Sequence, residues 1–289
     1  MDKRVAVIGG SGLYLFDGMD DVREVEVKTP YGATSDVISI GRLGDAEVAF
    51  IPRHGRGHRF TPSEVPYRAN IWALKSLGVS RIFSASAVGS MKEEVLLAKP
   101  VLVDQFIDRT CNRQSTFFGD GIVAHVSMAQ STCPALRGLL QSTAKELGID
   151  VIEKGTYVCI EGPQFSSRAE SFMYRDIGVD VIGMTNATEA KLAREAEICY
   201  ATIAIPTDYD CWHETHDAVS VETVVATLSR GIGKARDLIA KAIVNIDKIG
   251  SCSCGDALAN AIMTDHKRIP DAAKTRLAPI VGRYLDLDK

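Results

Sequence analysis

The sequence predicts an α/β fold in one domain, with a mostly parallel or mixed β-sheet. The first observation is that β-branched runs alternate with segments of helical periodicity from Tyr67 onward. The second is that no internal repeat or linker rich in proline or serine divides the chain. The third is size, because 289 residues with 46% hydrophobic content are enough to bury a large core without covalent cross-links.

Short β-branched runs predict the strands. The run 3–8 ends in Gly9-Gly10-Ser11-Gly12, which indicates a buried strand leading into a tight glycine turn. Further strands are predicted at 36–41, 47–52, 81–87, 101–107, 155–160, 179–184 and 198–205.

Apolar residues at helical spacing predict the helices. The segments 67–77 and 133–147 each stop at a glycine, Gly78 and Gly148, as helices commonly do. Three more helices are predicted at 166–176, 188–197 and 219–248, with Gly231 as a candidate break in the last. The final forty residues lack clear periodicity, and we expect a helical tail around 250–289 that covers a sheet edge or a neighbouring subunit.

Charge and hydropathy exclude several classes of protein. The net charge is −4, which excludes a broad basic surface for nucleic acid. No run of about 18 apolar residues is present, so we expect no transmembrane helix and no membrane partner. The opening Met1-Asp2-Lys3-Arg4-Val5 lacks the apolar stretch of a secretion signal, so we expect a cytoplasmic protein.

Two segments are candidates for binding an anion. The glycine turn at 9–12 can direct backbone N–H groups at an anion, with Ser11 adding a hydroxyl; it can also be an ordinary turn. It fits a dinucleotide fingerprint poorly, because no third glycine follows, and no lysine of a Walker A loop is present. Arg53-His54-Gly55-Arg56-Gly57-His58 follows a strand, and Arg53 offers a fork of donors. The alternative is a solvated basic loop.

Four further segments end predicted strands or follow turns. Ser84–Ser90 offers small hydroxyls, or simply tight packing. Phe165 follows a Gly-Pro turn and is either a stacking face or a core aromatic. Met184 and Thr185 offer an apolar surface and a donor. Asp208 and Asp210 share one face of an extended chain, where burial and mutual repulsion would raise a carboxyl pKa and allow acid catalysis; a solvated turn is the alternative.

Taken together, these segments resemble the trimeric purine nucleoside phosphorylases, in particular the members that cleave methylthioadenosine. The similarity covers roughly residues 3–248, in order. It runs through the glycine turn, the Arg53–His58 loop, 67–75, 104–110, 160–173 and Thr207-Asp208-Tyr209-Asp210-Cys211-Trp212. The resemblance implies a single phosphorylase domain with a mixed, partly closed sheet flanked by helices. It implies phosphorolysis, in which inorganic phosphate attacks C1′ of the ribosyl group and the purine leaves. No metal or organic cofactor is implied, since phosphate is a co-substrate.

The resemblance also assigns roles to residues. It places phosphate against Ser11, Arg53, His54, Ser86, Ala87 and Thr185. It places Met184 under the ribose, Phe165 on the purine, and Asp208 against N7 and the 6-amino group with Asp210 beside it. Members acting on 6-oxopurines carry asparagine at the Asp208 position and glutamate at the Ser166 position, so both residues favour adenine here. Val221 and Val224, with His125 of a neighbouring subunit, match an apolar 5′ pocket that favours methylthio over hydroxyl modestly.

The cysteines leave two possibilities open. The spacing of the seven cysteines fits no C-x2-C pair and no zinc-finger pattern, which predicts reduced thiols and no metal. Yet Cys252-Ser-Cys254 resembles a C-terminal pair that forms a disulfide in some archaeal thermophilic members. Cys133, Cys199 and Cys211 stand at positions similar to bridged ones there, so disulfides and free thiols both stand. The resemblance further implies a homotrimer, or a hexamer made from two trimers.

Other functions fit these residues less well than a phosphorylase does. A phosphorylase for 6-oxopurine nucleosides is disfavoured by Asp208 and Ser166. A nucleosidase, which uses water, needs no anion cradle such as Arg53 and Ser86. An oxidoreductase is disfavoured by the incomplete glycine pattern, and a binding module without catalysis would not need the acidic pair.

Overall fold

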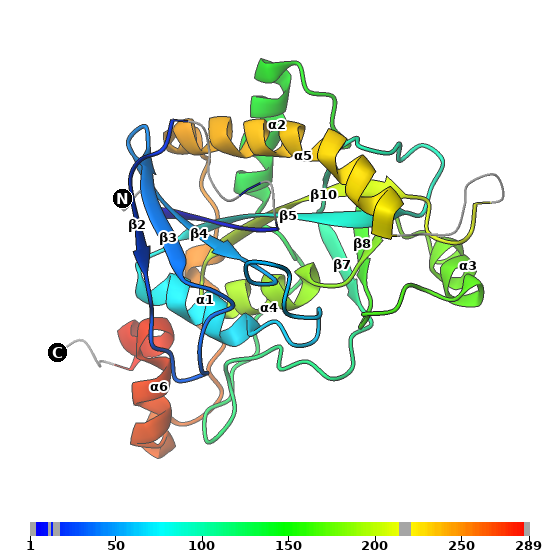
Figure 1. The fold of residues 1–289 in the computed structure, drawn as a ribbon. Helices are drawn as coiled ribbons and strands as arrows, with labels where there is room; N and C mark the ends of the chain where they lie inside the picture. Colours follow the sequence, from blue (N-terminus) through cyan, green and yellow to red (C-terminus); the bar gives the residue numbers. More distant parts are fainter. Residues whose placement is uncertain (1–3, 11–12, 14–17, 214–220, 286–289) are drawn as a thin grey trace.

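The computed structural model describes residues 4–10, 13, 18–213 and 221–285. Within these residues, a sheet of ten strands is flanked by six α-helices (Figure 1). The predicted α/β class is confirmed. No helix in the described ranges has both the length and the apolar character needed to cross a membrane.

The centre of the sheet is β5 (Arg81–Ser90), which has three strand neighbours. It pairs in parallel with β1 (Arg4–Gly9) on one side and with β10 (Cys199–Asp208) on the other. At its end it also pairs antiparallel with β9 (Val181–Gly183). The sheet therefore branches at β5 and is mixed, as predicted.

The remaining strands extend the sheet in both directions. On the β1 side, β4 (Ala46–Pro52) pairs in parallel with β1, and β3 (Ile38–Leu43) and β2 (Asp20–Val25) follow antiparallel. On the β9 side, β8 (Thr156–Cys159) and β7 (Gln105–Asp108) follow in parallel. The single strand predicted at 101–107 was wrong. It is divided into β6 (Val101–Leu102), antiparallel to β10, and β7, because the chain crosses here between two branches of the sheet.

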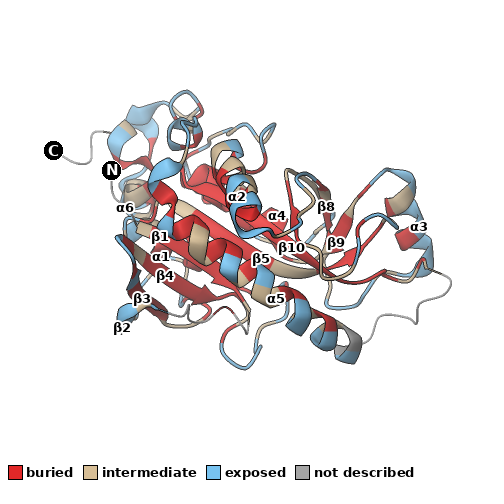
Figure 2. Cartoon of the chain, turned by 90° about the horizontal axis from the view of Figure 1, so that it is seen from above, coloured by how far each residue is buried: buried red, intermediate tan, exposed pale blue. Residues whose placement is uncertain are grey.

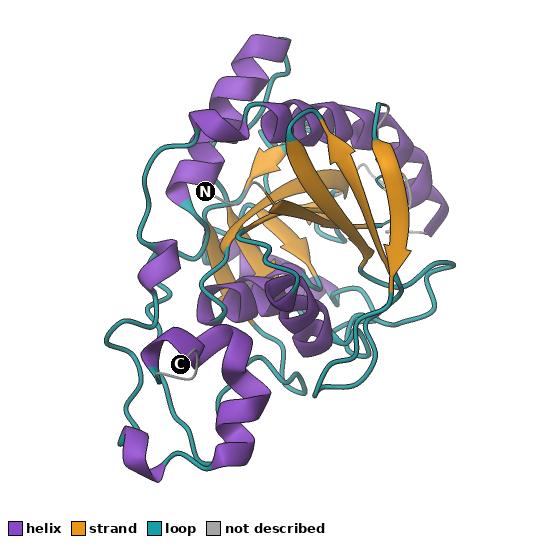
Figure 3. Ribbon diagram, turned by 90° about the vertical axis from the view of Figure 1, so that its left-hand side faces the viewer, coloured by secondary structure: helices purple, strands orange, loops and turns teal. Residues whose placement is uncertain are grey.

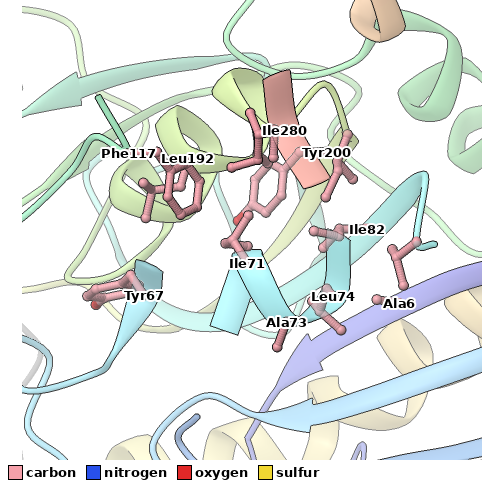
Figure 4. Packing of buried hydrophobic residues seen from close by; sticks show 14 of the residues in the cluster. Ala6, Tyr67, Ile71, Ala73, Leu74, Ile82, Phe117, Leu192, Tyr200 and Ile280 are labelled. Carbon is pink, nitrogen blue, oxygen red and sulfur yellow. The ribbon is translucent and has the colours of Figure 1, made fainter. Parts of the chain in front are cut away.

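Helices cover both faces of the sheet (Figures 1 and 3). Alternate residues of β1 point to opposite faces. Val5 and Val7 pack in a cluster with α2 (Pro134–Leu147) and α5 (Val221–Val244). Ala6 and Ile8 pack in a second cluster with α1 (Tyr67–Ser76), α4 (Asn186–Glu195) and α6 (Asp271–Val281). Figure 4 shows this second cluster, and Figure 2 shows the buried sheet beneath outward-facing exposed helix residues. The sixth helix, α3 (Arg168–Asp176), begins at a capping box of Ser167 and Glu170.

The candidate break at Gly231 is not present, because α5 continues through it. A Cβ atom at this position would lie 2.5 Å from Cγ2 of Ile205, so the glycine permits close packing of α5 on β10. Gly231 therefore indicates close packing of the helix against the sheet and not a kink.

The C-terminal segment is fastened to the end of α4 by one buried carboxylate. Glu197 accepts hydrogen bonds from the Leu258 backbone N–H at 2.9 Å and from the Tyr284 hydroxyl at 2.6 Å, and it pairs with Arg283. Further along, Trp72 of α1 donates to the Arg276 carbonyl of α6 at 2.9 Å. The segment after α5 is thus tied to the body of the fold through both Glu197 and Trp72, among other contacts.

Candidate active site

A cavity of about 260 Å³ opens where strands β1, β4, β5 and β10 end. These strands are parallel to one another, so the loops that follow them meet at one edge of the sheet, where α/β proteins bind ligands. The cavity brings together most of the site residues predicted from the sequence. They are Arg53, His54, Ser86, Ala87, Phe165, Ser166, Met184, Thr185, Asp208, Asp210 and Val224.

Three predicted residues are not placed on this wall. Ser11 lies outside the described residues, although Gly10 directly before it lines the cavity. Val221 begins α5, but its side chain also falls outside what is described. His125 is exposed and does not line the cavity of its own chain; its backbone N–H donates to the Ala261 carbonyl. A role for His125 would therefore require a second subunit.

Arg53 lines the cavity and is only 3% exposed. Its Nε lies 2.5 Å and its Nη2 lies 3.1 Å from the two carboxylate oxygens of Glu189, which makes a bidentate pair. Nη2 also donates to Ser84 Oγ at 2.6 Å, and Nη1 donates to the Ala85 carbonyl at 2.9 Å. One Nη1 hydrogen is left over from these contacts, so Arg53 can offer one direct hydrogen bond to an anion.

Other hydrogen-bond donors line the same cavity. Thr185 caps the N-terminus of α4, whose first backbone N–H groups carry the positive end of the helix dipole. The Ser86 hydroxyl is buried on this wall, and beyond its interaction with the Tyr157 hydroxyl it has no well-aligned hydrogen bond among the described residues. A buried unpaired hydroxyl is costly unless a ligand satisfies it. Together, Arg53, Ser86 and the start of α4 have the chemistry of an anion site.

His54 is neutral at physiological pH. Burial, followed by the nearby Arg53 charge, lowers its pKa to about 4. Nδ1 lies 2.8 Å from the Phe60 carbonyl, which assigns the proton to Nδ1 and leaves Nε2 as an acceptor. The ring stacks on His58, another residue of the wall, with centroids 4.2 Å apart. His54 can therefore accept a hydrogen bond from a protonated phosphate oxygen or a sugar hydroxyl.

Another part of the cavity wall carries an aromatic side chain and two buried carboxyl groups. Phe165 is 48% exposed and lines the cavity, so its ring is accessible for stacking. Ser166 next to it has a buried hydroxyl that interacts with the Asp210 carboxylate. Asp208 ends β10, and Asp210 follows with a φ of 50°.

Burial raises the pKa of Asp208 to about 6, and repulsion from Asp210 adds to it. Two hydrogen bonds act in the opposite direction. The Thr207 hydroxyl lies 2.8 Å from Oδ2, and the Asp210 backbone N–H lies 2.9 Å from Oδ1. Burial also raises the pKa of Asp210. A carboxyl group with a pKa near 6 can hold or share a proton close to neutral pH, which suits a general acid.

The absence of a side chain at Gly89 leaves room for the Asp208 carboxylate. A Cβ atom there would lie 3.0 Å from Oδ1 of Asp208 and 2.8 Å from Cγ2 of Ile182. We expect Gly89→Ala to displace the carboxylate and to lower kcat/KM by about 10- to 100-fold, since small misplacements of reacting groups are costly. The matched control is Gly138→Ala in α2, where a Cβ meets nothing within 4 Å. Equal kinetics for the two variants in a steady-state assay would contradict this account.

Reasoning from sequence missed the residues behind the wall. Glu189, the partner of Arg53, lies one helical turn after Thr185, and this spacing was the available signal. Asn186 is fully buried and donates to Tyr200 Oη at 2.9 Å and to Thr202 Oγ1 at 2.6 Å. Its position among three strands gives no local signal in the sequence.

Arg113 was also missed, and it supports the middle of the cavity. Its guanidinium donates to the Met184 and Glu161 carbonyls and pairs with the Glu161 carboxylate at 3.3 Å. Burial would raise the pKa of Glu161, but hydrogen bonds from Ser63, Cys111 and Asn112 and the Arg113 charge lower it to about 2. Glu161 thus stays ionised and keeps Arg113, and with it the Met184 backbone, in position.

The disulfides considered from the sequence are not supported. All seven cysteines, each within the described ranges, are free thiols. Cys211 lies beside the site, where its Sγ is 3.3 Å from the Ser166 carbonyl. Cys133, Cys199, Cys252 and Cys254 gather elsewhere in the fold, away from the described wall of the cavity.

Known proteins are similar to this chain over nearly all of its length. The family described as "Phosphorylase superfamily" matches residues 4–244. An S-methyl-5′-thioadenosine phosphorylase of Geobacter sulfurreducens is 53% identical over 99% of this chain and 100% of its own. A crystal structure of a methylthioadenosine phosphorylase from an antarctic soil metagenomic library superposes with a TM-score of 0.91 at 49% identity, covering 96% of this chain and 98% of its own. A Schistosoma mansoni methylthioadenosine phosphorylase in complex with adenine superposes at 0.82 with 33% identity, over 98% of this chain and 99% of that one.

Proposed function

Because this chain belongs to the phosphorylase superfamily, we propose that it cleaves S-methyl-5′-thioadenosine with inorganic phosphate. The products are adenine and 5-methylthioribose-1-phosphate, so the enzyme is a pentosyltransferase that serves purine and methionine salvage. The observation that carries the proposal is the cavity itself. Its wall combines an anion site with a stacking ring and a buried carboxyl group of raised pKa.

The anion site binds and positions the phosphate. Arg53 supplies a charged donor, and Ser86, Thr185 and the start of α4 supply neutral ones. Ser11 and the Ala87 backbone are expected to complete this cradle. The bound phosphate then lies on one face of the ribose, above Met184, and its negative charge stabilises the oxocarbenium character that develops at C1′. The chemistry uses phosphate as a co-substrate and requires no cofactor.

The buried carboxyl groups in the cavity wall assist departure of the base. A purine leaves as an anion unless N7 gains a proton. Protonated Asp208 donates to N7 and accepts from the 6-amino group, while Phe165 stacks on the ring and Asp210 holds Asp208 through its backbone N–H. Ser166 offers no carboxylate to bind N1–H of a 6-oxopurine. These residues favour adenine over the alternative substrates, inosine and methylthioinosine.

The 5′ end of the substrate meets an apolar wall. Val224, Leu228 and Ile232 line the cavity from successive turns of α5. Burial of a methylthio group here stabilises binding, while a hydroxyl group would lose hydrogen bonds to water. Discrimination between the two is modest for an apolar pocket, so adenosine is expected to be a slower substrate.

Assembly into a homotrimer, or into a hexamer of two trimers, would complete this wall. His125 of a neighbouring subunit would then close the 5′ pocket together with Val221. Exposed apolar residues support an oligomer, among them Val123 beside His125 and the α3 residues Phe172 and Met173. The proposed partners are therefore other copies of the chain and small molecules, with no nucleic acid or membrane, and we propose the cytoplasm as the site of action.

The test is product analysis by mass spectrometry. Methylthioadenosine is incubated with the enzyme with and without inorganic phosphate, and inosine is run in parallel. Adenine with methylthioribose-1-phosphate, formed only when phosphate is present, is the expected result. Free methylthioribose formed without phosphate would mean a nucleosidase. Cleavage of inosine with methylthioadenosine left intact would mean that the roles of Asp208 and Ser166 are wrong.

A further inference from the structure

Four cysteines from three distant parts of the chain meet in the fold. The Sγ atoms of Cys133, Cys199, Cys252 and Cys254 all lie within 4.8 Å of one another. Cys133 is the N-cap of α2, Cys199 is the first residue of β10, and the other two come from the segment after α5. Nothing in the proposed phosphorolysis uses these thiols.

The geometry matches a tetrahedral metal site. Zinc bound by four thiolates has Zn–S distances of about 2.3 Å, which places the sulfur atoms about 3.8 Å apart. The Cys199 and Cys252 sulfur atoms lie 3.4 Å apart, and the 4.8 Å limit covers the other pairs. The group consists of sulfur ligands alone, which select zinc over magnesium or calcium. We propose that these four cysteines bind one structural Zn²⁺ per chain.

The surroundings of the cluster suit thiolate ligands. Nη1 of Arg194 lies 3.4 Å from Cys254 Sγ, and the Leu136 backbone N–H lies 3.4 Å from Cys133 Sγ. Arg194 is 9% exposed, so its charge is little screened by water. Four thiolates and one Zn²⁺ carry a net charge of −2, which the guanidinium and the N-terminus of α2 offset. On binding, each thiol releases its proton to solvent, and no oxidation or reduction takes place.

The site fastens the C-terminal segment to the core. Cys133, Cys199 and Cys254 are buried in the cluster formed with α2 and α5, whereas Cys252 is exposed and gives the metal a route of entry. A zinc ion here would join α2, β10 and the segment that continues to α6. It would act next to the Glu197 anchor of the same segment, and its role would be stability and not catalysis.

Metal analysis of the full chain tests this inference. The protein is purified under reducing conditions without a metal-affinity tag, and its zinc, iron and copper are measured by plasma mass spectrometry. About one zinc per chain is expected, and the Cys252→Ser/Cys254→Ser variant is expected to hold less than about a tenth of that, since two of four ligands are gone. Cys111→Ser, an exposed thiol outside the cluster, is the matched control and keeps its zinc.

A second measurement needs no variant. Modification of the wild-type thiols should release one zinc per chain into a chromophoric chelator, and Co²⁺ in place of Zn²⁺ should give the absorption of a tetrahedral thiolate site. Reduced protein that takes up no zinc from an equimolar solution would overturn the proposal. So would iron in place of zinc, or an intact mass four hydrogens lower, which would show two disulfides instead.

Discussion

Replacement of Asp208 by asparagine is expected to slow cleavage of S-methyl-5′-thioadenosine by about 10²–10⁴-fold, the usual contribution of a general acid. Asparagine keeps the size of the side chain and can still accept the Asp210 backbone N–H, but it has no acidic proton for N7. The loss is expected mainly in kcat, while KM for phosphate stays close to its original value. Cleavage of inosine relative to methylthioadenosine should improve, because the amide can donate to a 6-oxo group.

The pKa of Asp208 also predicts the direction in which kcat/KM changes with pH. The pKa of Asp208 is about 6, so the protonated fraction falls as pH rises through 6. For the wild type, kcat/KM should therefore decline above about pH 6, and the Asp208→Asn profile should lack this decline. Asp237→Asn, in an exposed position on α5, is the matched control. The proposed role of Asp208 would be wrong if asparagine left both the rate and the pH profile unchanged.

The Asp208→Asn substitution should raise stability at high pH although it lowers activity. The pKa of Asp208 is raised from 3.8 to about 6 by folding, so the folded state favours the neutral form. Wild-type stability from this group is fully present below pH 4 and is lost as pH rises through 6. Asp208→Asn carries no such charge and should be at least as stable as the wild type at pH 8. The difference between the two proteins should shrink toward pH 4, as measured by chemical denaturation.

Removal of the Arg53 charge is expected to lower the free energy of unfolding by about 3–5 kcal/mol, the cost of leaving a buried ion without its partner. In Arg53→Met, the carboxylate of Glu189 remains, and it is only 2% exposed. It would keep hydrogen bonds from Tyr200 and Ser84 but lose both bonds from the guanidinium. Denaturant unfolding of the purified variant measures the loss.

A double variant separates stability from phosphate binding. Arg53→Met/Glu189→Leu removes both charges, so it should recover more than half of the lost stability. Its KM for phosphate should nevertheless stay raised by at least about 10-fold, because the charged donor is absent. Arg56→Met is the control, since the exposed Arg56–Glu24 pair should contribute less than about 1 kcal/mol. A double variant no more stable than the single one would show that the buried pair is not the source of the loss.

Local sequence patterns predicted most of the fold. Runs such as β1 and β10 are apolar and β-branched, and helices such as α2 stop at a glycine, so their positions followed from periodicity. The failures were of another kind. β2 is an exposed edge strand, so its residues show no buried alternation. The division of 101–107 into two strands depends on which neighbours each half meets, and that is decided by the whole sheet.

The candidate site likewise contains residues that the sequence could predict and residues that it could not. Residues that end strands, such as Arg53 and Asp208, could be found because their position in the sequence fixes their place at the edge of the sheet. Glu189 and Asn186 could not, because a buried polar partner is defined by three-dimensional contact. The four-cysteine cluster lies between these two cases. The resemblance indicated all four residues, together with Cys211, but no spacing in the sequence shows which of them meet, since they come from a helix cap, a strand start and a distant loop.

The pairing of β5 with β10 has a consequence for how the chain is made. About a hundred residues separate the two strands, so a ribosome adding roughly 5–20 residues per second completes β5 some 5–20 s before β10 is available. During that interval, one apolar edge of the central strand has no partner and can pair with other chains. Ser86, proposed to bind phosphate, and Asp208, the proposed acid, also stay apart until β10 is inserted. The nascent chain is therefore inactive and most prone to aggregate over the same interval, and chaperone binding would be most useful then.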